Sequence, residues 1–255
     1  MRMYQLTVAV ALCGLLVVGC SPGGKDRGPA IDMAAGLAQA KAARAEFDTA
    51  WERLRDVRDE LEVLKKKARP SAEDTARLSE LESLVKEAQQ AYDEAFTADD
   101  SALTGFLNEA LNNLPNHPAT AEGLRLYADK AMRNAGDFMK VSGDYRRAIE
   151  ILDAAASYYE AINLPVPEDL VAYRQHARDM RFITQERFDQ IKRNMTMDEV
   201  KAITGTPFFP NVREHETQGR KVITWFFNRE DGEVAALHFL AGKVYNTTWR
   251  VERQR

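Results

Sequence analysis

The sequence predicts a mainly α-helical protein with a C-terminal α+β module, and three observations support this prediction. Apolar residues recur at helical spacing from residue 33 to about residue 181, in a composition rich in Ala, Glu, Lys, Arg and Leu. From residue 182 onward, segments of β-branched and aromatic residues are separated by turn signals. A short apolar run near the N-terminus precedes a stretch with Pro and Gly. The changes divide the chain into segments 1–19, 20–32, 33–98, 99–181 and 182–255.

Residues 1–19 have the parts of a secretory signal peptide. Arg2 lies near the start, and an apolar core of about 13 residues, Leu6 to Val18, is shorter than the roughly 20 residues that a membrane-spanning helix needs. The motif Val17-Val18-Gly19-Cys20 resembles the bacterial lipobox. This resemblance implies cleavage after Gly19 and attachment of lipid to Cys20. An uncleaved anchor and a simple signal peptide are the alternatives.

Residues 20–32 are predicted to be a flexible tether, because Pro22-Gly23-Gly24 follows Cys20 and Ser21. Ser21 would be the second residue of the mature protein, and in this position the chain resembles lipoproteins that are exported to the outer membrane. Several acyl chains on one residue form a lasting membrane anchor. The expected location is therefore the periplasmic face of the outer membrane, with membrane lipid as a partner. Since Cys13 leaves with the signal and Cys20 carries lipid, no disulfide is expected.

Residues 33–98 are predicted to form an antiparallel coiled-coil hairpin. Pro70 separates two helices, and Ser71 with Asp74 forms a capping box that restarts the second. Small or apolar residues alternate in steps of three and four, which is typical of a heptad seam. The seam positions are Phe47, Ala50, Leu54, Val57, Leu61, Leu64 and Ala68, then Leu78, Leu81, Val85, Ala88, Tyr92 and Ala95. The spacing does not choose between pairing within one chain and pairing between chains.

Residues 99–181 are predicted to form a repeat-like helical bundle. The run Gly143 to Ile149, followed by Ala155, Tyr159 and Pro167, resembles a tetratricopeptide repeat. One repeat cannot bury both of its faces, so flanking helices are needed. The resemblance implies a groove that binds a peptide or a protein. A plain helical bundle is the alternative.

Residues 182–255 are predicted to form two short helices on a three-stranded antiparallel sheet. Thr196 and Glu199 form a capping box, and Gly205 ends the helix that it starts. The predicted strands are Val222–Phe227, Val234–Phe239 and Lys243–Val251, separated by Asp231-Gly232 and Ala241-Gly242 turns.

The same segment carries a family resemblance over about residues 180–251. Phe188 to Val200, then Gly205-Thr206-Pro207, a strand with Trp225, and Phe239 to Val244 are similar to the SmpA/OmlA family of BamE-like outer-membrane lipoproteins. The resemblance implies a module that binds and steadies other envelope proteins, and that has no catalytic site. Here the hairpin and the helical bundle stand between the module and the lipidated cysteine, and Asn194 occupies a position that is usually glycine in the family.

No catalytic residue, metal site or cofactor is predicted. The four histidines, His117, His176, His215 and His238, lack ligand spacing, and no hydrolase or phosphate-binding motif occurs. The formal net charge of −4 gives no indication of a nucleic-acid partner. Phe208 and Phe209 are candidate partner contacts, since aromatic residues often carry the affinity of an interface. The alternative is that at least one of them packs on the sheet.

Together these features lead to an expected function. The protein is expected to be a non-enzymatic scaffold or accessory factor in envelope biogenesis, with outer-membrane β-barrel assembly as the first candidate process and assembly components as partners. The alternative is a coordinator of cell-wall or division complexes that binds through its coiled-coil and repeat-like helices. A hydrolase with an unfamiliar site is a third class, and no converging titratable residues point to it.

Overall fold

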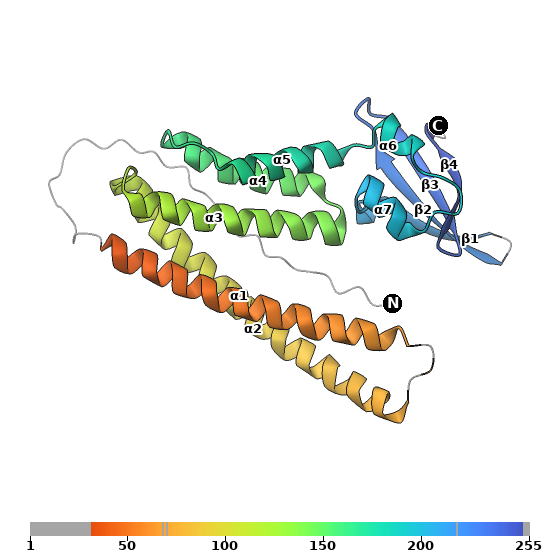
Figure 1. The fold of residues 1–255 in the computed structure, drawn as a ribbon, viewed down its shortest axis with the longest axis horizontal. Helices are drawn as coiled ribbons and strands as arrows, with labels where there is room; N and C mark the ends of the chain where they lie inside the picture. Colours follow the sequence, from red (N-terminus) through yellow and green to blue (C-terminus); the bar gives the residue numbers. More distant parts are fainter. Residues whose placement is uncertain (1–31, 68, 70, 218, 252–255) are drawn as a thin grey trace. The chain divides into compact units, whose positions relative to one another are not determined.

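The computed structural model describes residues 32–67, 69, 71–217 and 219–251, all of which belong to one structural unit. This part of the chain is mainly helical and ends in an antiparallel sheet (Figure 1). The helical segments are α1 (Met33–Lys65), α2 (Ala72–Asn113), α3 (Pro118–Asp137), the π-helical turn η1 (Phe138–Ser142), α4 (Tyr145–Ala161), α5 (Glu168–Arg181), α6 (Gln185–Asp189), α7 (Met197–Thr204) and the 3₁₀ turn η2 (Phe209–Asn211). The strands are β1 (Val212–Thr217), β2 (Arg220–Asn228), β3 (Val234–Leu240) and β4 (Lys243–Thr248).

The first two helices pack against each other in opposite directions (Figure 1). Arg44 in the first half of α1 contacts Asp99 in the second half of α2, and Lys65 at the end of α1 pairs with Glu82 near the start of α2 at 3.0 Å. The predicted capping box is confirmed: the Asp74 N–H donates to Ser71 Oγ at 3.0 Å, and the Ser71 N–H donates to the Asp74 carboxylate at 2.9 Å. Asp74 stands where a capping box usually has Glu or Gln, and its carboxylate accepts a hydrogen bond from the N-cap N–H in the same way.

Helix α2 does not end near residue 98, where the sequence suggested a change of segment, but continues to Asn113. The regular apolar seam is interrupted at Asp99, which lies on the buried side of the helix. The carboxylate can be buried at this position because Arg44 and Lys130 neutralise it. The change in pattern marks the place where α3 joins α1 as a partner of α2.

A cluster of buried charges connects α1, α2 and α3. The Asp99 side chain is fully buried, and its carboxylate accepts hydrogen bonds from Arg44 Nε at 2.9 Å and Nη2 at 3.2 Å. Lys130 Nζ of α3 lies 2.8 Å from Asp99 Oδ2, which also accepts from Arg44 Nη2, and 2.9 Å from the Asp100 carboxylate. The Arg44 and Lys130 side chains are only 8% and 6% exposed, so the ion pairs are largely shielded from water. Breaking such a buried pair leaves an uncompensated charge.

Helices α3, α4 and α5 run in alternating directions. The aromatic rings of Tyr127 in α3 and Tyr158 in α4 meet edge to face at 5.2 Å, and Arg178 of α5 pairs with Asp153 of α4 at 2.8 Å. Of the residues that resemble a tetratricopeptide repeat, Gly143 lies in the turn before α4, Ala155 lies inside α4, and Pro167 caps the start of α5. The repeat itself remains a prediction.

The C-terminal sheet has four strands in the order β1-β2-β3-β4, so the prediction of three strands was wrong. The missed strand, β1, pairs with β2 from Val212 opposite Trp225 to Thr217 opposite Arg220. It forms an edge of the sheet and carries the polar sequence Val-Arg-Glu-His-Glu-Thr. Hydrophobic pattern therefore gave no sign of it, and charged residues on an edge strand are a common protection against unwanted strand pairing.

The core of the C-terminal part lies on one face of the sheet, where α6 and α7 pack (Figure 1). Phe188 of α6 and Val200 of α7 meet strand residues on this face, including Trp225, Leu237 and Phe239. The capping box at the start of α7 is confirmed, with the Thr196 N–H donating to Glu199 at 2.7 Å. Hydrogen bonds to this carboxylate hold the pKa of Glu199 below its usual range.

The buried cluster predicts a large cost for removing its carboxylate. We expect Asp99→Ala to lower the free energy of unfolding by about 3–5 kcal/mol, because Arg44 and Lys130 would stay buried without a counter-charge. Asp100→Ala is the matched control: its side chain is 49% exposed, so its loss should cost less than about 1 kcal/mol. Urea unfolding followed by circular dichroism measures both. An equal loss of unfolding free energy in the two variants would contradict the larger contribution expected of Asp99.

Candidate functional site

The C-terminal module, residues 182–251, is held against the helical part by the loop that follows α7. The Thr206 N–H donates to Tyr145 Oη at 3.1 Å, and Thr206 Oγ1 donates to the Lys140 carbonyl at 3.1 Å. Two glycines allow this approach: a Cβ on Gly143 would lie 2.5 Å from the Pro207 backbone, and one on Gly205 would lie 2.0 Å from Tyr145 Oη. The backbone leading into residue 208 is therefore fixed from two sides.

A second contact joins the module to the end of α5. The Arg187 guanidinium of α6 donates to the carbonyls of Asp179 and Phe182. These carbonyls belong to the last turn of α5 and its C-cap, where helices leave backbone acceptors unsatisfied, and a cation there also suits the helix dipole. Burial lowers the pKa of Arg187 from its ordinary value, although the group keeps its charge at physiological pH.

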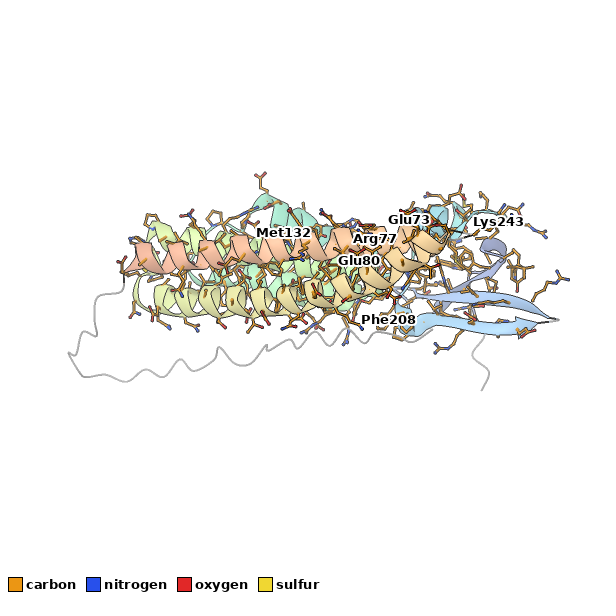
Figure 2. The ribbon with its side chains drawn as sticks, turned by 90° about the horizontal axis from the view of Figure 1, so that it is seen from below. Glu73, Arg77, Glu80, Met132, Phe208 and Lys243 are labelled. Carbon is orange, nitrogen blue, oxygen red and sulfur yellow. The ribbon has the colours of Figure 1, made fainter. Side chains whose placement is uncertain are left out.

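The aromatic loop, residues 208–210, presents two exposed rings. Phe208 is 36% exposed and Phe209 is 54% exposed, so the alternative that one of them is buried in the sheet was wrong. That alternative assumed an extended chain, in which neighbouring side chains point in opposite directions. The chain instead enters the 3₁₀ turn η2 at Phe209, with the Asn211 N–H donating to the Phe208 carbonyl at 2.7 Å. Phe208 is labelled in Figure 2.

The other face of the sheet, opposite α6 and α7, has no described helix over it and is called the open face below (Figure 1). Side chains alternate along a strand, so the neighbours of the core residues Trp225, Leu237 and Phe239 project to the open face. Thr224 and His238 confirm this arrangement, since Thr224 Oγ1 and His238 Nδ1 lie 3.0 Å apart across β2 and β3.

A hollow of about 400 Å³ lies on the open face, near the end of β2. Phe226, Val234 and Val251 supply apolar surface, and the amides of Asn211 and Asn228 stand beside it. The remaining lining residue is Arg213 of β1, whose Nη1 donates to the carbonyls of Pro210 at 2.5 Å and Val212 at 3.1 Å. These bonds tie the arginine to the chain that leaves the aromatic loop.

Charge is distributed unequally between the two faces of the sheet. By the strand register, the open face carries Arg213, His215 and Arg220, all exposed, and no Asp or Glu at the described strand positions. The acidic residues of β1, Glu214 and Glu216, project to the other face, where Glu214 pairs with Lys221 at 2.7 Å. The open face is therefore basic, although the whole chain has a net charge of −4.

His238 is the partly buried titratable group of the open face. Burial lowers its pKa below the ordinary value of 6.5, and the nearby charge of His215 lowers it further. Its ring also lies 6.0 Å from the ring of Tyr245. The neutral form of the imidazole is therefore the form that the fold favours.

The remaining predicted residues are placed as follows. Gly19 and Cys20 lie outside the described residues, so cleavage and lipid attachment remain predictions. His117 caps α3, with Nδ1 accepting from the Ala119 N–H at 3.1 Å, and His176 is exposed on α5. Among the residues that the structure describes, no three His, Cys, Asp or Glu side chains come together as a metal site. Within the same ranges, no helix has the length and apolar character to cross a membrane.

Arg213, His215 and Arg220 were not predicted from the sequence as parts of one surface, because the first predicted strand began only at Val222. One signal was present: Gln218-Gly219 stands between two runs of similar length, and a glycine at such a point indicates a hairpin turn. Gly219 has a φ of 69°, as turns of this kind require.

Gly143 and Gly242 both have a positive φ. Comparing their alanine variants separates the steric cost of a methyl group from the conformational cost of a non-glycine residue. Gly143→Ala and Gly242→Ala share the conformational cost of about 1 kcal/mol, since φ is 65° and 76°. Only Gly143→Ala also drives a methyl group into the Pro207 backbone, because nothing lies within 4 Å of the Gly242 position. We expect a further loss of about 1–3 kcal/mol for Gly143→Ala, measured by urea unfolding. Equal losses would mean that the close contact with Pro207 adds nothing to stability.

The lowered pKa of His238 predicts a pH effect on stability. A depressed pKa in the folded state contributes stability above the unfolded value of 6.5, and this contribution is lost as the pH falls through the folded pKa. We expect His238→Gln to flatten the fall in unfolding free energy below pH 6.5, and His215→Gln to reduce it in part. Urea unfolding at pH 7.5, 6.5 and 5.5 tests this expectation. An unchanged slope in His238→Gln would show that other groups cause the fall.

Comparison with known proteins adds no relative to this picture. No protein-family model, no curated protein and no solved structure matches the chain. The resemblances to the lipobox, the tetratricopeptide repeat and the SmpA/OmlA family therefore rest on the residues quoted for them.

Proposed function

We propose that this protein is a lipoprotein anchored through Cys20 in the outer membrane, facing the periplasm, and that it is a non-enzymatic scaffold for outer-membrane β-barrel assembly. The observation that carries the scaffold role is the aromatic loop, with two exposed phenylalanines on a backbone that the helical part holds in place. The resemblance to the SmpA/OmlA family supports the choice of process, and the lipobox resemblance supports the anchor.

The aromatic loop suits a protein contact for two physical reasons. Phenylalanine rings bring large apolar area to an interface, and such residues often supply most of its affinity. The loop is also ordered before binding, because Thr206 is bonded to Tyr145 and Lys140. A preorganised contact loses less conformational entropy when the partner binds.

The helical part supports a spacer role in this proposal. Helix α2 has 42 residues, which corresponds to about 63 Å at 1.5 Å per residue. An anchored chain with an extended helical hairpin holds partners at a distance from its lipid attachment. The surfaces of these helices are also where the alternative function, coordination of cell-wall or division complexes, would have its contacts.

The scaffold proposal is tested by capture from native membranes. The full-length protein is cross-linked in cells, purified, and its bound proteins are identified by mass spectrometry. We expect β-barrel assembly components to be enriched, and the double variant Phe208→Ala, Phe209→Ala to lower their recovery by about tenfold or more, since hot-spot residues contribute 2 kcal/mol or more.

Two controls make the result decisive. The double variant Val63→Ala, Val171→Ala removes apolar side chains that are 66% and 41% exposed on α1 and α5, and it should leave recovery unchanged. If it abolishes capture of cell-wall or division factors while the phenylalanine variant has no effect, the helices carry the function. Cys20→Ala should move the protein to the soluble fraction, and a protein that stays membrane-bound and uncleaved would contradict the anchor.

A further inference from the structure

We propose that the open face of the C-terminal sheet binds an acidic segment of a partner protein in extended conformation. The juxtaposition of exposed cations and an apolar hollow on one helix-free sheet face supports this inference. The proposal deepens the proposed function by giving the chemistry of a protein partner, and it rests on that function only in taking the partner to be a protein. It uses residues other than Phe208 and Phe209.

The charge pattern selects an acidic partner. Arg213 and Arg220 are exposed on the open face, His215 lies between them along the hairpin, and no described strand position on this face is acidic. Two acidic residues of the turn between β2 and β3 are already paired, Asp231 with Arg229 and Glu233 with Arg250. Arg213 uses the two N–H groups of Nη1 for backbone carbonyls, and a guanidinium has three further N–H donors on Nε and Nη2. A carboxylate is the complementary group.

The spacing of the two arginines fits an extended chain. Arg213 stands opposite Thr224, and Arg220 precedes Thr224 by four residues on β2. At about 3.3 Å per residue this places the two positions about 13 Å apart along the strands. Residues i and i+4 of an extended partner have the same separation and point to the same side. Two carboxylates at this spacing can therefore reach both arginines.

The shape of the surface favours a protein segment over a flat lipid surface. Phe226, Val234 and Val251 form a hollow of about 400 Å³ beside Arg213, which has room for apolar side chains. The amides of Asn211 and Asn228 stand next to it and are suited to hydrogen bonds with a peptide backbone. A partner with apolar residues close to its carboxylates would use both features.

Addition of the partner as a further strand on β1 is less suited to this sheet. Strand β1 carries Glu214 and Glu216 beside its arginine and histidine, so its edge has charges of both signs. Mixed charges on an edge oppose pairing with another strand. The face, and not the edge, is therefore the surface that selects for acidic segments.

The test uses the purified full-length protein in a neutral detergent at pH 7.5. The probe is a fluorescein-labelled peptide with Glu, Leu and Glu at alternate positions separated by Ser, and the control peptide has Lys in place of Glu. Fluorescence polarisation should show that the Glu peptide binds about tenfold or more tightly than the Lys peptide. Binding should also weaken as salt is raised, because exposed charges are screened.

Two neighbouring cations on opposite faces provide the matched variants. Arg220→Glu reverses a charge on the open face, and Lys221→Glu makes the same change on the face with Glu214. We expect Arg220→Glu to weaken binding of the Glu peptide by about three- to tenfold, and Lys221→Glu to leave it unchanged. Circular dichroism verifies that both variants fold, and Arg220→Gln replaces Arg220→Glu if the latter does not.

Several outcomes would overturn the proposal. These are equal binding of the two peptides, equal effects of the two variants, or no peptide binding together with Arg220-dependent binding of soluble dihexanoyl phosphatidylglycerol. The last result would assign the open face to membrane lipid. Failure here is distinct from failure of the scaffold function, because capture from membranes is read through Phe208 and Phe209, with Arg220 unchanged.

Discussion

The packing of α1, α2 and α3 depends on one buried carboxylate. Asp99 belongs to α2, and its carboxylate accepts hydrogen bonds from Arg44 of α1 and forms an ion pair with Lys130 of α3. Arg44, Asp99 and Lys130 lie far apart in the sequence, and they fix three helices at one point through charges that have almost no access to water. Ion pairs of this kind contribute little net stability over a well-packed apolar core, but they strongly penalise any arrangement that separates them. Asp99 therefore acts mainly by selecting one register of the helices.

Aromatic side chains pack beside the Asp99 cluster, between α1 and α2. Phe47 packs with Tyr92 and Phe96 at ring distances of 5.4 and 5.9 Å, and the Lys130 ammonium lies 4.7 Å from the Phe96 ring. The same cation thus meets both a carboxylate and an aromatic face. Cation–π contacts gain strength when they are shielded from water, as they are here. The charged cluster and the apolar seam are continuous parts of one interface.

Local signals in the sequence predicted much of the helical structure, including the break near Pro70 and both capping boxes. These features depend on residues three or four positions apart, so the sequence displays them directly. The length of α2 and the strand β1 were missed because each depends on distant partners: Asp99 needs Arg44, and the polar strand needs β2 beside it. The candidate site followed the same rule. The pair Phe208 and Phe209 was visible in the sequence, although its exposure became known only from the structure, whereas the basic open face exists only once the register of β1 against β2 is known.

The uninterrupted course of α2 has a mechanical consequence. Its first half packs on the second half of α1, and its second half packs on the first half of α1 and on α3, with no turn between them. A displacement of the hairpin end would be transmitted along the continuous helix α2 to its ion pair with Lys130 of α3. Helix α3 leads into η1, where the Lys140 carbonyl accepts a hydrogen bond from Thr206. The two exposed rings beyond Thr206 would then register strain applied tens of ångströms away, at about 1.5 Å per helical residue. The helical part therefore offers a continuous path from the hairpin end to the loop that carries Phe208 and Phe209.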